Sequence, residues 1–197
     1  MINAIVYDIE IIKAIPNKGE PLIEGIEYCK GWHDHAGMGV SVIGVYDFVE
    51  DRYRVFCKGN FVEFFGLTVN RKYLVSFNGV GFDNKVLNNQ WTGFNEKWQM
   101  PVDGQYDLLQ EIWSAYGQRF KGSGLDAMCS ANGLGGKTGH GSLAPVMWQR
   151  GQMGAVIDYC LQDVKLTKEL FLLSQRGPLK SPAGGELNLR RIINEDN

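Results

Sequence analysis

The chain has 197 residues, of which 44% are hydrophobic and 21% charged, and its formal net charge at pH 7 is −2. These values exclude disordered, collagen-like and coiled-coil chains, and they fit one ordinary globular domain. A protein that coats DNA by charge alone would be basic, so the slightly acidic balance argues against that class. An enzyme that keeps a cluster of carboxylates for metal ions is compatible with this charge.

No apolar run in the sequence approaches the roughly 20 residues that span a bilayer. Asp8 and Glu10 interrupt the stretch where a signal peptide would be apolar. The four cysteines are dispersed and form no C-x-x-C pair. This pattern favours free thiols in a reducing compartment over disulfides or a zinc ribbon. We therefore expect a cytoplasmic protein that has no membrane partner; a phage origin would also fit.

The order of predicted elements indicates an α/β domain. Strands are predicted from β-forming apolar runs at residues 4–7, 40–48, 53–57 and 72–77. Helices are predicted at residues 60–67, 82–89, 107–116, 125–132 and 155–174. Asp107 and Gln110 form a capping box at the start of the third helix. Because the early strands pair locally and later ones alternate with helices, we expect a mixed sheet.

Two segments match no regular element. Residues 11–39 form a long insertion after the first strand, and residues 133–154 are rich in glycine. Long irregular segments inside a compact domain tend to be functional. We expect one domain over residues 1–176, followed by a polar, loosely attached tail over residues 177–197.

The first candidate motif is the D-x-E pair of Asp8 and Glu10. Residues two apart on a strand point to the same face, so the two carboxylates would lie side by side. Like charges this close are costly unless a cation neutralises them. Taken alone, the pair is equally compatible with an ordinary loop entry. A D-x-D phosphatase would need an aspartate where Glu10 stands.

The second candidate motif is the segment SFNGVGFD at residues 76–83. A strand leads into a glycine-rich turn, and the turn would project Asp83 toward the same sheet edge as Asp8. The helix macrodipole alone also explains an acid at a helix start. A dinucleotide-binding fingerprint would need glycine where Asn84 stands, so that class is excluded.

The third candidate motif joins Tyr159 and Asp163, which are four residues apart on the last predicted helix. That spacing places both side chains on one face of the helix. A hydroxyl and a carboxylate on one face could serve a metal-bound water. In isolation, a half-buried tyrosine and a solvated acid are the better interpretation.

Taken in this order, the acid pair, the N-x-x-x-F-D turn and the Y-x-x-x-D helix resemble the three exonuclease motifs of the DEDD superfamily. The tyrosine points to the DEDDy branch. The sequence is most similar to the proofreading exonuclease domain of B-family DNA polymerases, from about residue 5 to residue 173. The resemblance implies an RNase H-like α/β fold, with a central mixed sheet of about five strands flanked by helices. We expect no polymerase domain within this length.

The resemblance also implies a two-metal-ion mechanism with Mg²⁺ or Mn²⁺, in which the ions lie about 4 Å apart. Asp8, Glu10 and Asp163 would hold one ion. Asp8 would bridge to a second ion, and Asp83 would help largely through water. Tyr159 would orient the attacking water, since a usual pKa near 10 argues against a resting general base.

Three further residues are candidates for substrate binding. By the resemblance, Asn78 and Phe82 would lie near the terminal nucleotide, although Phe82 could equally belong to the core. Lys137 is the first choice for a phosphate contact among the basic residues between 115 and 150, where a solvated loop is an equal alternative. The nearby GLGGKT segment is not a P-loop, because Ala131 stands where that pattern needs glycine.

Aromatic side chains in the insertion form one more candidate feature. Trp32, His33 and His35 could stack on bases or close over the site. A zinc site there is the less favoured interpretation, because only His140 remains as a third histidine.

The function that these features imply is a metal-dependent 3′→5′ exonuclease. We expect it to release nucleoside monophosphates from single-stranded DNA or frayed 3′ ends in DNA replication or repair, beside a polymerase or another replication protein. One alternative is a 3′→5′ exoribonuclease of the same branch, which would depend on contacts to the 2′-OH. Another is a proofreading or scaffold subunit that mainly binds a polymerase. The complete acid set argues against a binding-only role: Asp8, Glu10, Asp83 and Asp163.

Overall fold

A computed structural model describes residues 2–90, 96–136 and 141–193 of the chain. Within these residues a five-stranded sheet has the order β3-β2-β1-β4-β5. The strands are β1 (Ala4–Ile11), β2 (Val40–Asp47), β3 (Arg52–Phe56), β4 (Tyr73–Ser76) and β5 (Gln105–Asp107). The pairs β1–β2 and β2–β3 are antiparallel, whereas β1–β4 and β4–β5 are parallel. The predicted α/β fold with a mixed five-stranded sheet is thus confirmed.

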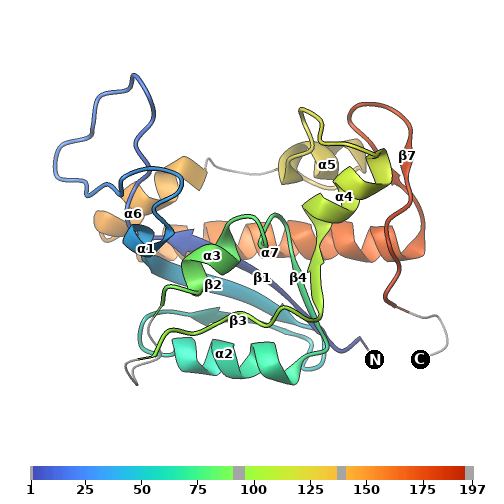
Figure 1. Ribbon diagram of the computed structural model, residues 1–197, viewed down its shortest axis with the longest axis horizontal. Coiled ribbons are helices and arrows are strands. Elements are labelled where there is room, and N and C mark those ends of the chain that lie inside the picture. Colours follow the sequence, from blue (N-terminus) through green and yellow to red (C-terminus); the bar gives the residue numbers. More distant parts are fainter. Residues whose placement is uncertain (1, 91–95, 137–140, 194–197) are drawn as a thin grey trace.

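Helices cover both faces of this sheet (Figure 1). They are α1 (His35–Met38), α2 (Phe61–Asn70), α3 (Asp83–Leu87), α4 (Leu108–Tyr116), α5 (Leu125–Ala131), the 3-10 turn η1 (Gly141–Leu143), α6 (Ala144–Gln149) and α7 (Met153–Arg176). The long α7 runs along one side of the sheet, and α2 packs on the other. Of the helices described, none has the length and apolar character needed to cross a membrane.

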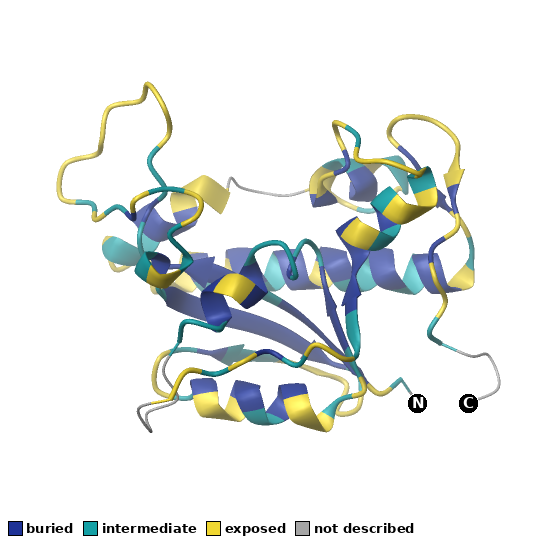
Figure 2. Cartoon of the chain, viewed as in Figure 1, coloured by how far each residue is buried: buried dark blue, intermediate teal, exposed yellow. Residues whose placement is uncertain are grey.

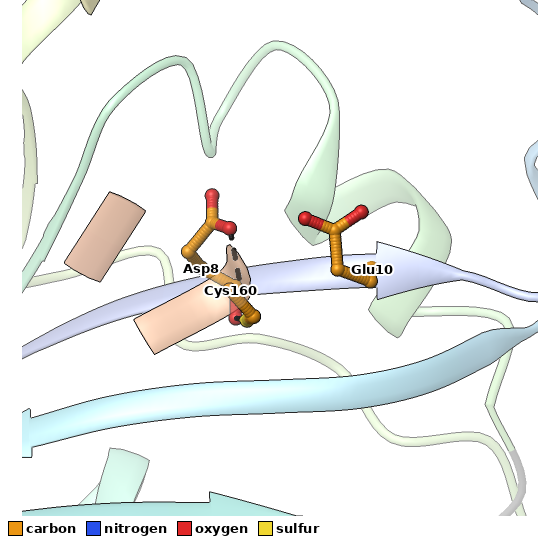
Figure 3. Close-up of side chains that lie close together, drawn as sticks. All are labelled: Asp8, Glu10 and Cys160. Atoms are coloured by element: carbon orange, nitrogen blue, oxygen red, sulfur yellow. Dashed lines mark hydrogen bonds between the residues drawn. The ribbon is translucent and has the colours of Figure 1, made fainter. Parts of the chain in front are cut away.

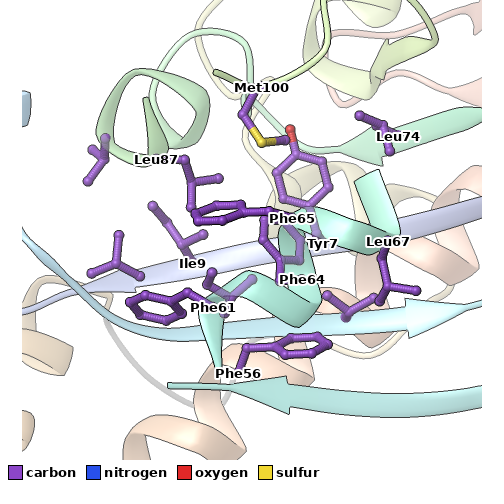
Figure 4. Packing of buried hydrophobic residues seen from close by; sticks show 14 of the residues in the cluster. Tyr7, Ile9, Phe56, Phe61, Phe64, Phe65, Leu67, Leu74, Leu87 and Met100 are labelled. Carbon is purple, nitrogen blue, oxygen red and sulfur yellow. The ribbon is translucent and has the colours of Figure 1, made fainter. Parts of the chain in front are cut away.

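Strand β1 lies in the middle of the sheet and is buried on both faces (Figure 2). Its odd-numbered residues face α2: Tyr7 and Ile9 belong to one apolar cluster with Phe61, Phe64 and Phe65 (Figure 4). Side chains alternate between the faces of a strand. The even-numbered residues of β1 therefore point toward α7.

The face of β1 that points toward α7 is apolar at the start of the strand and polar toward its end. Ala4 and Val6 are fully buried in a cluster with Leu170 and Phe171 of α7. The same alternation brings the next even-numbered residues, Asp8 and Glu10, onto the α7 face. The sheet thus carries two carboxylates where its hydrophobic core ends.

Helix α7 comes unusually close to the sheet where it crosses β2. A Cβ atom built on Gly44 would lie 2.9 Å from the Cys160 Sγ and 3.1 Å from the Val164 Cγ2. Real Cβ atoms essentially never come within 3.0 Å of another heavy atom, so a larger residue at position 44 would force the Cys160 side chain or α7 to shift. Because Gly44 pairs with Asp8 across the β1–β2 ladder, this crossing also fixes the height of α7 above Asp8.

Several elements differ from the sequence prediction. Strand β1 continues to Ile11, four residues beyond the predicted end, so the insertion begins at Ile12. Strand β5 was not predicted, because its three residues are too short for a recognisable alternation. Short helices, α1 and α6, occupy parts of the two segments that were expected to be irregular.

The segment after Gly177 is attached more closely than expected. Its strands β6 (Leu179–Lys180) and β7 (Glu186–Leu187) form a small hairpin. Leu179, Leu187 and Leu189 are buried against the core beside α7. The Tyr106 hydroxyl also donates a hydrogen bond of 2.6 Å to the carbonyl oxygen of Arg190. Three leucines among polar residues, together with this hydrogen bond, anchor the segment.

Candidate active site

A cavity of about 280 Å³ opens beside the acidic half of β1. Its walls bring together side chains from β1, the turn after β4, the start of α3 and the middle of α7. They include seven of the predicted site residues: Asp8, Glu10, Asn78, Phe82, Asp83, Tyr159 and Asp163. The eighth, Lys137, lies outside the described residues. The structure thus places these seven together, and their catalytic and binding roles stay predictions.

Asp8 and Glu10 rise from the same side of β1 (Figure 3). Carboxylate oxygens of both residues and the Cys160 Sγ all lie within 4.8 Å of one another. Glu10 is buried and Asp8 half-buried. The register of the β1–β2 ladder shifts between Glu10 and Ile11, so the pair stands directly before an irregularity that ends the regular pairing. Irregularities of this kind often lie next to active sites.

Asp83 is held against β1 by the backbone. The Ile9 N–H donates a hydrogen bond of 3.2 Å to the Asp83 Oδ1. Burial raises the pKa of Asp83 to about 7, and the negative charges of Asp107 and Asp163 add to the effect, while hydrogen bonds from backbone N–H groups oppose it. The charged form of Asp83 is therefore costly without a nearby cation.

The residue after Asp83 ties α3 to the same strand. The hydroxyl of Tyr7, which precedes Asp8, donates a hydrogen bond of 2.5 Å to the Asn84 Oδ1. Both residues are buried. Strand β1 and the start of α3 are thus joined by two hydrogen bonds, from the Tyr7 hydroxyl to the Asn84 side chain and from the Ile9 N–H to the Asp83 carboxylate.

The turn that carries Asn78 is shaped by Asp107. Asn78 has a φ of 68°, which is the left-handed conformation that asparagine tolerates better than most residues. Its N–H donates to the Asp107 Oδ1 at 2.9 Å, and the Val80 N–H donates to the Oδ2 at 3.0 Å. Asp107 also caps α4 by accepting from the Leu109 N–H at 3.0 Å. The predicted capping aspartate therefore has a second role, which the sequence did not reveal.

Tyr159 and Asp163 are both buried on the side of α7 that faces the cavity. The one-face placement predicted from their spacing is confirmed. A Cβ on Gly141 would lie 3.1 Å from the Tyr159 hydroxyl. Glycine at residue 141 therefore leaves room next to the Tyr159 hydroxyl, and a larger side chain would reduce that room.

Cys160 is a site residue that the sequence did not single out. Its thiol donates to the backbone oxygen of Asp8 at 3.5 Å and contacts the Asp8 Oδ2 at 3.8 Å (Figure 3). Burial raises the pKa of this thiol, and the charges of Asp8 and Glu10 raise it further. Cys160 thus contacts Asp8 at both its backbone oxygen and its carboxylate.

The insertion also contributes to the cavity wall. Ile15, Asn17 and Trp32 line it together with the catalytic candidates. Ile15 and Asn17 had no signal in the sequence, because they lie in an irregular segment without periodicity. Trp32 was a candidate from its residue type alone.

The donor set suits a hard divalent cation. Carboxylates from β1, α3 and α7 converge on one cavity, and Mg²⁺ prefers oxygen ligands and keeps several waters. Burial is the main cause of the raised pKa of Asp83, and the negative charges of Asp107 and Asp163 add to it. Asp8 and Glu10 bring carboxylate oxygens close enough together to form a possible metal-binding group, and Asp83 and Asp163 line the same cavity.

Comparison with known families agrees with this geometry. Residues 88–180, a little less than half of the chain, match the family described as "Predicted 3'-5' exonuclease related to the exonuclease domain of PolB". The resemblance to the exonuclease domain of B-family DNA polymerases is confirmed. The matched segment includes Tyr159 and Asp163, whereas the first two motifs lie before it.

Solved structures show the same fold. One is the family B DNA polymerase from the hyperthermophilic archaeon Pyrobaculum calidifontis, which matches with a TM-score of 0.58 and 17% sequence identity. The match covers 87% of this chain and 25% of the polymerase, so the chain corresponds to a quarter of that protein. No match to this sequence is found among curated proteins.

Proposed function

We propose that the protein is a metal-dependent exonuclease that hydrolyses single-stranded DNA or frayed duplexes from the 3′ end and releases nucleoside monophosphates. The observation that carries this proposal is the convergence of four carboxylates and the Tyr159 side chain on one cavity. The match to a family of predicted 3′→5′ exonucleases supports the reaction class. Single-stranded DNA, the metal ions and the individual roles are our inference.

The carboxylates divide between two proposed metal positions. Asp8, Glu10 and Asp163 would hold one divalent ion, and Asp8 would share a second with Asp83. Two bound ions would supply an activated water and neutralise the charge that develops at the phosphate. The pair on β1 is already brought together for this task, because a carboxylate oxygen of Asp8 lies within 4.8 Å of one of Glu10.

The remaining side chains would position the reactants. The Tyr159 hydroxyl would hydrogen-bond the attacking water, as its place beside the open space at Gly141 allows. Asn78 and Phe82 would contact the terminal nucleotide from the turn on the opposite wall. Glu10 would also accept a hydrogen bond from the terminal 3′ hydroxyl.

The test is a time course on DNA and RNA single strands of identical sequence, each labelled at the 5′ end. The reactions contain Mg²⁺, Mn²⁺ or EDTA, and Asp8→Ala is run in parallel. A DNA ladder that shortens stepwise, and only with metal and Asp8, supports the proposal. Loss of the label in the first step would contradict the proposed polarity.

The same experiment separates the alternatives. Equal or faster shortening of RNA would favour an exoribonuclease of the same branch. If the folded protein cleaves neither strand, a role in binding a polymerase or another replication protein becomes the better hypothesis.

A further inference from the structure

The insertion over residues 12–39 is fixed to the body of the protein at its base. The Ile12 N–H donates a hydrogen bond of 3.1 Å to the Gly39 carbonyl oxygen. The Gln149 side chain of α6 donates to the carbonyl oxygens of Ile12 and Glu27 at 2.9 and 3.0 Å, and accepts from the Glu27 N–H at 2.7 Å. In Figure 1 the insertion rises beside α6 and returns through α1. It is therefore a built part of the cavity rim.

A compact turn within the insertion presents Trp32. The Asp34 carboxylate accepts hydrogen bonds from the Lys30 N–H at 2.9 Å and the Gly37 N–H at 3.2 Å. A Cβ on Gly37 would lie 2.2 Å from the Asp34 Oδ2, so a larger residue there would displace the Asp34 carboxylate from its present position. Asp34 thus holds both ends of the loop on which Trp32 stands.

The indole of Trp32 is exposed although it belongs to the cavity wall. The residue is 62% exposed and lines the cavity. Its ring meets the Phe82 ring edge-on, with centroids 6.1 Å apart and planes at 63°. His35 contacts the same phenylalanine at 6.1 Å. Phe82 therefore supports the indole at its edge, and a large part of the indole surface is left open to solvent.

The surroundings of Trp32 are basic, in contrast to the acidic cavity. Lys30 and His33 line the adjoining depression together with Trp32. The one acid in that depression, Asp34, binds backbone N–H groups of its own loop. Aromatic surfaces flanked by basic side chains are the usual features of single-stranded nucleic-acid sites, where bases stack and phosphates are neutralised.

We infer that Trp32 is the stacking platform for the base next to the terminal nucleotide, and that Lys30 and His33 contact the phosphate beyond it. The inference rests on the proposed function, because it takes the cavity as the site of the terminal nucleotide. Stacking on an indole does not distinguish one base from another, so the site would accept 3′ ends of any sequence. Because the base must be unpaired to stack on Trp32, single-stranded ends would be favoured over intact duplex.

The test compares Trp32→Ala and Trp32→Phe with the unchanged protein. Tyr53→Ala is the matched control, since Tyr53 is a 40% exposed aromatic residue outside the cavity wall. Binding of a fluorescein-labelled oligodeoxythymidylate is measured by anisotropy in EDTA, where no hydrolysis occurs. Hydrolysis with Mn²⁺ is measured on the oligonucleotide and on the p-nitrophenyl ester of thymidine 5′-monophosphate, which has no second base.

Trp32→Ala should weaken binding roughly 5- to 150-fold, the range that corresponds to one stacked base. The ratio of kcat/KM on the oligonucleotide to that on the ester should fall by a similar factor, and Trp32→Phe should lie between. Binding within twofold of the Tyr53→Ala control would overturn the inference. So would an equal loss on both substrates, because it would place Trp32 at the terminal nucleotide. If the unchanged protein cleaves neither substrate, the proposed function fails, and the binding measurement still tests Trp32.

Discussion

The carboxylate of Asp107 holds the backbone of Asn78 in a left-handed turn, at a distance of 2.9 Å from its N–H. Asn78 lies in the turn after β4, and Asp107 ends the neighbouring parallel strand β5, where it pairs with Ser76. The same carboxylate reaches Val80 and the start of α4. One buried side chain therefore shapes the turn that leads to Asp83.

Asp107→Ala should lower both stability and activity. It leaves the N–H groups of Asn78 and Val80 without their acceptor and removes the cap of α4. Each of these losses costs about 1 kcal/mol or more, so we expect a fall of about 2–3 kcal/mol in the free energy of unfolding. Asp107→Asn keeps one acceptor oxygen and should lose less. Urea unfolding measures the change in stability, and nuclease assays measure the change in activity. The control is Asp103→Ala, which changes an exposed aspartate. If Asp107→Ala behaved like this control, Asp107 would not be what shapes the turn and caps α4.

Asp8→Asn should separate catalysis from folding. The change keeps the size of the side chain but removes a charge from a crowded acidic group, so stability in EDTA should stay the same or increase. Turnover should fall by at least about 100-fold. Replacing a residue that only hydrogen-bonds a metal ligand costs up to about 100-fold, and losing a ligand itself should cost no less. The rise in Tm on adding Mg²⁺ should shrink as well.

The control for Asp8→Asn is Glu63→Gln, which neutralises an exposed acid on α2. If Asp8→Asn retained normal turnover, the proposed metal site would be wrong. If it lost activity only because it unfolded, melting curves in EDTA would show this directly.

The parts of the site that the sequence predicts are those that depend on local periodicity. Asp8 and Glu10 share a face because a strand alternates, and Tyr159 and Asp163 share a face because they are one helical turn apart. Their order along the chain then indicated a family whose fold brings the motifs together. None of these steps required knowledge of a contact between distant residues.

The parts that the sequence does not predict depend on contacts across the fold. Cys160 supports Asp8 from 152 positions away, and Asp107 shapes a turn 29 positions earlier. Gly44 permits the close approach of α7, yet its residue type alone suggests only a flexible strand. Such roles arise only when distant elements pack together, so a pattern within one segment cannot predict them.

Tyr159→Phe should reduce turnover without weakening metal binding. The ring still fills its buried position, while the hydroxyl that faces the cavity is lost. We expect the rate to fall by about 100-fold, at the lower end of the contribution from a positioned proton-transfer or hydrogen-bonding group. Titration of Mg²⁺ followed by thermal shift should give an unchanged apparent affinity. A large loss of affinity would instead make Tyr159 a contributor to the metal site.

Gly44→Ala should disturb the site from beneath. The added methyl group would meet the Cys160 Sγ at 2.9 Å and the Val164 Cγ2 at 3.1 Å, so these side chains, or α7 with them, must shift away from the sheet. Overpacking of this kind costs about 1–3 kcal/mol. Because α7 carries Tyr159 and Asp163 while Asp8 stays on β1, turnover should fall more than the loss of folded protein explains.

Gly66→Ala is the control for this change. Gly66 lies within α2 with no atom near its Cβ position, so alanine should leave activity unchanged and stabilise the helix by up to about 1 kcal/mol. Cys160→Ala removes the closest clashing atom, and adding it to Gly44→Ala should restore part of both stability and turnover. Two outcomes would contradict the idea that the spacing between α7 and β2 aligns Tyr159 and Asp163 with Asp8. One is that Gly44→Ala behaves like the control. The other is that the Gly44→Ala/Cys160→Ala double variant shows only the sum of the two single losses.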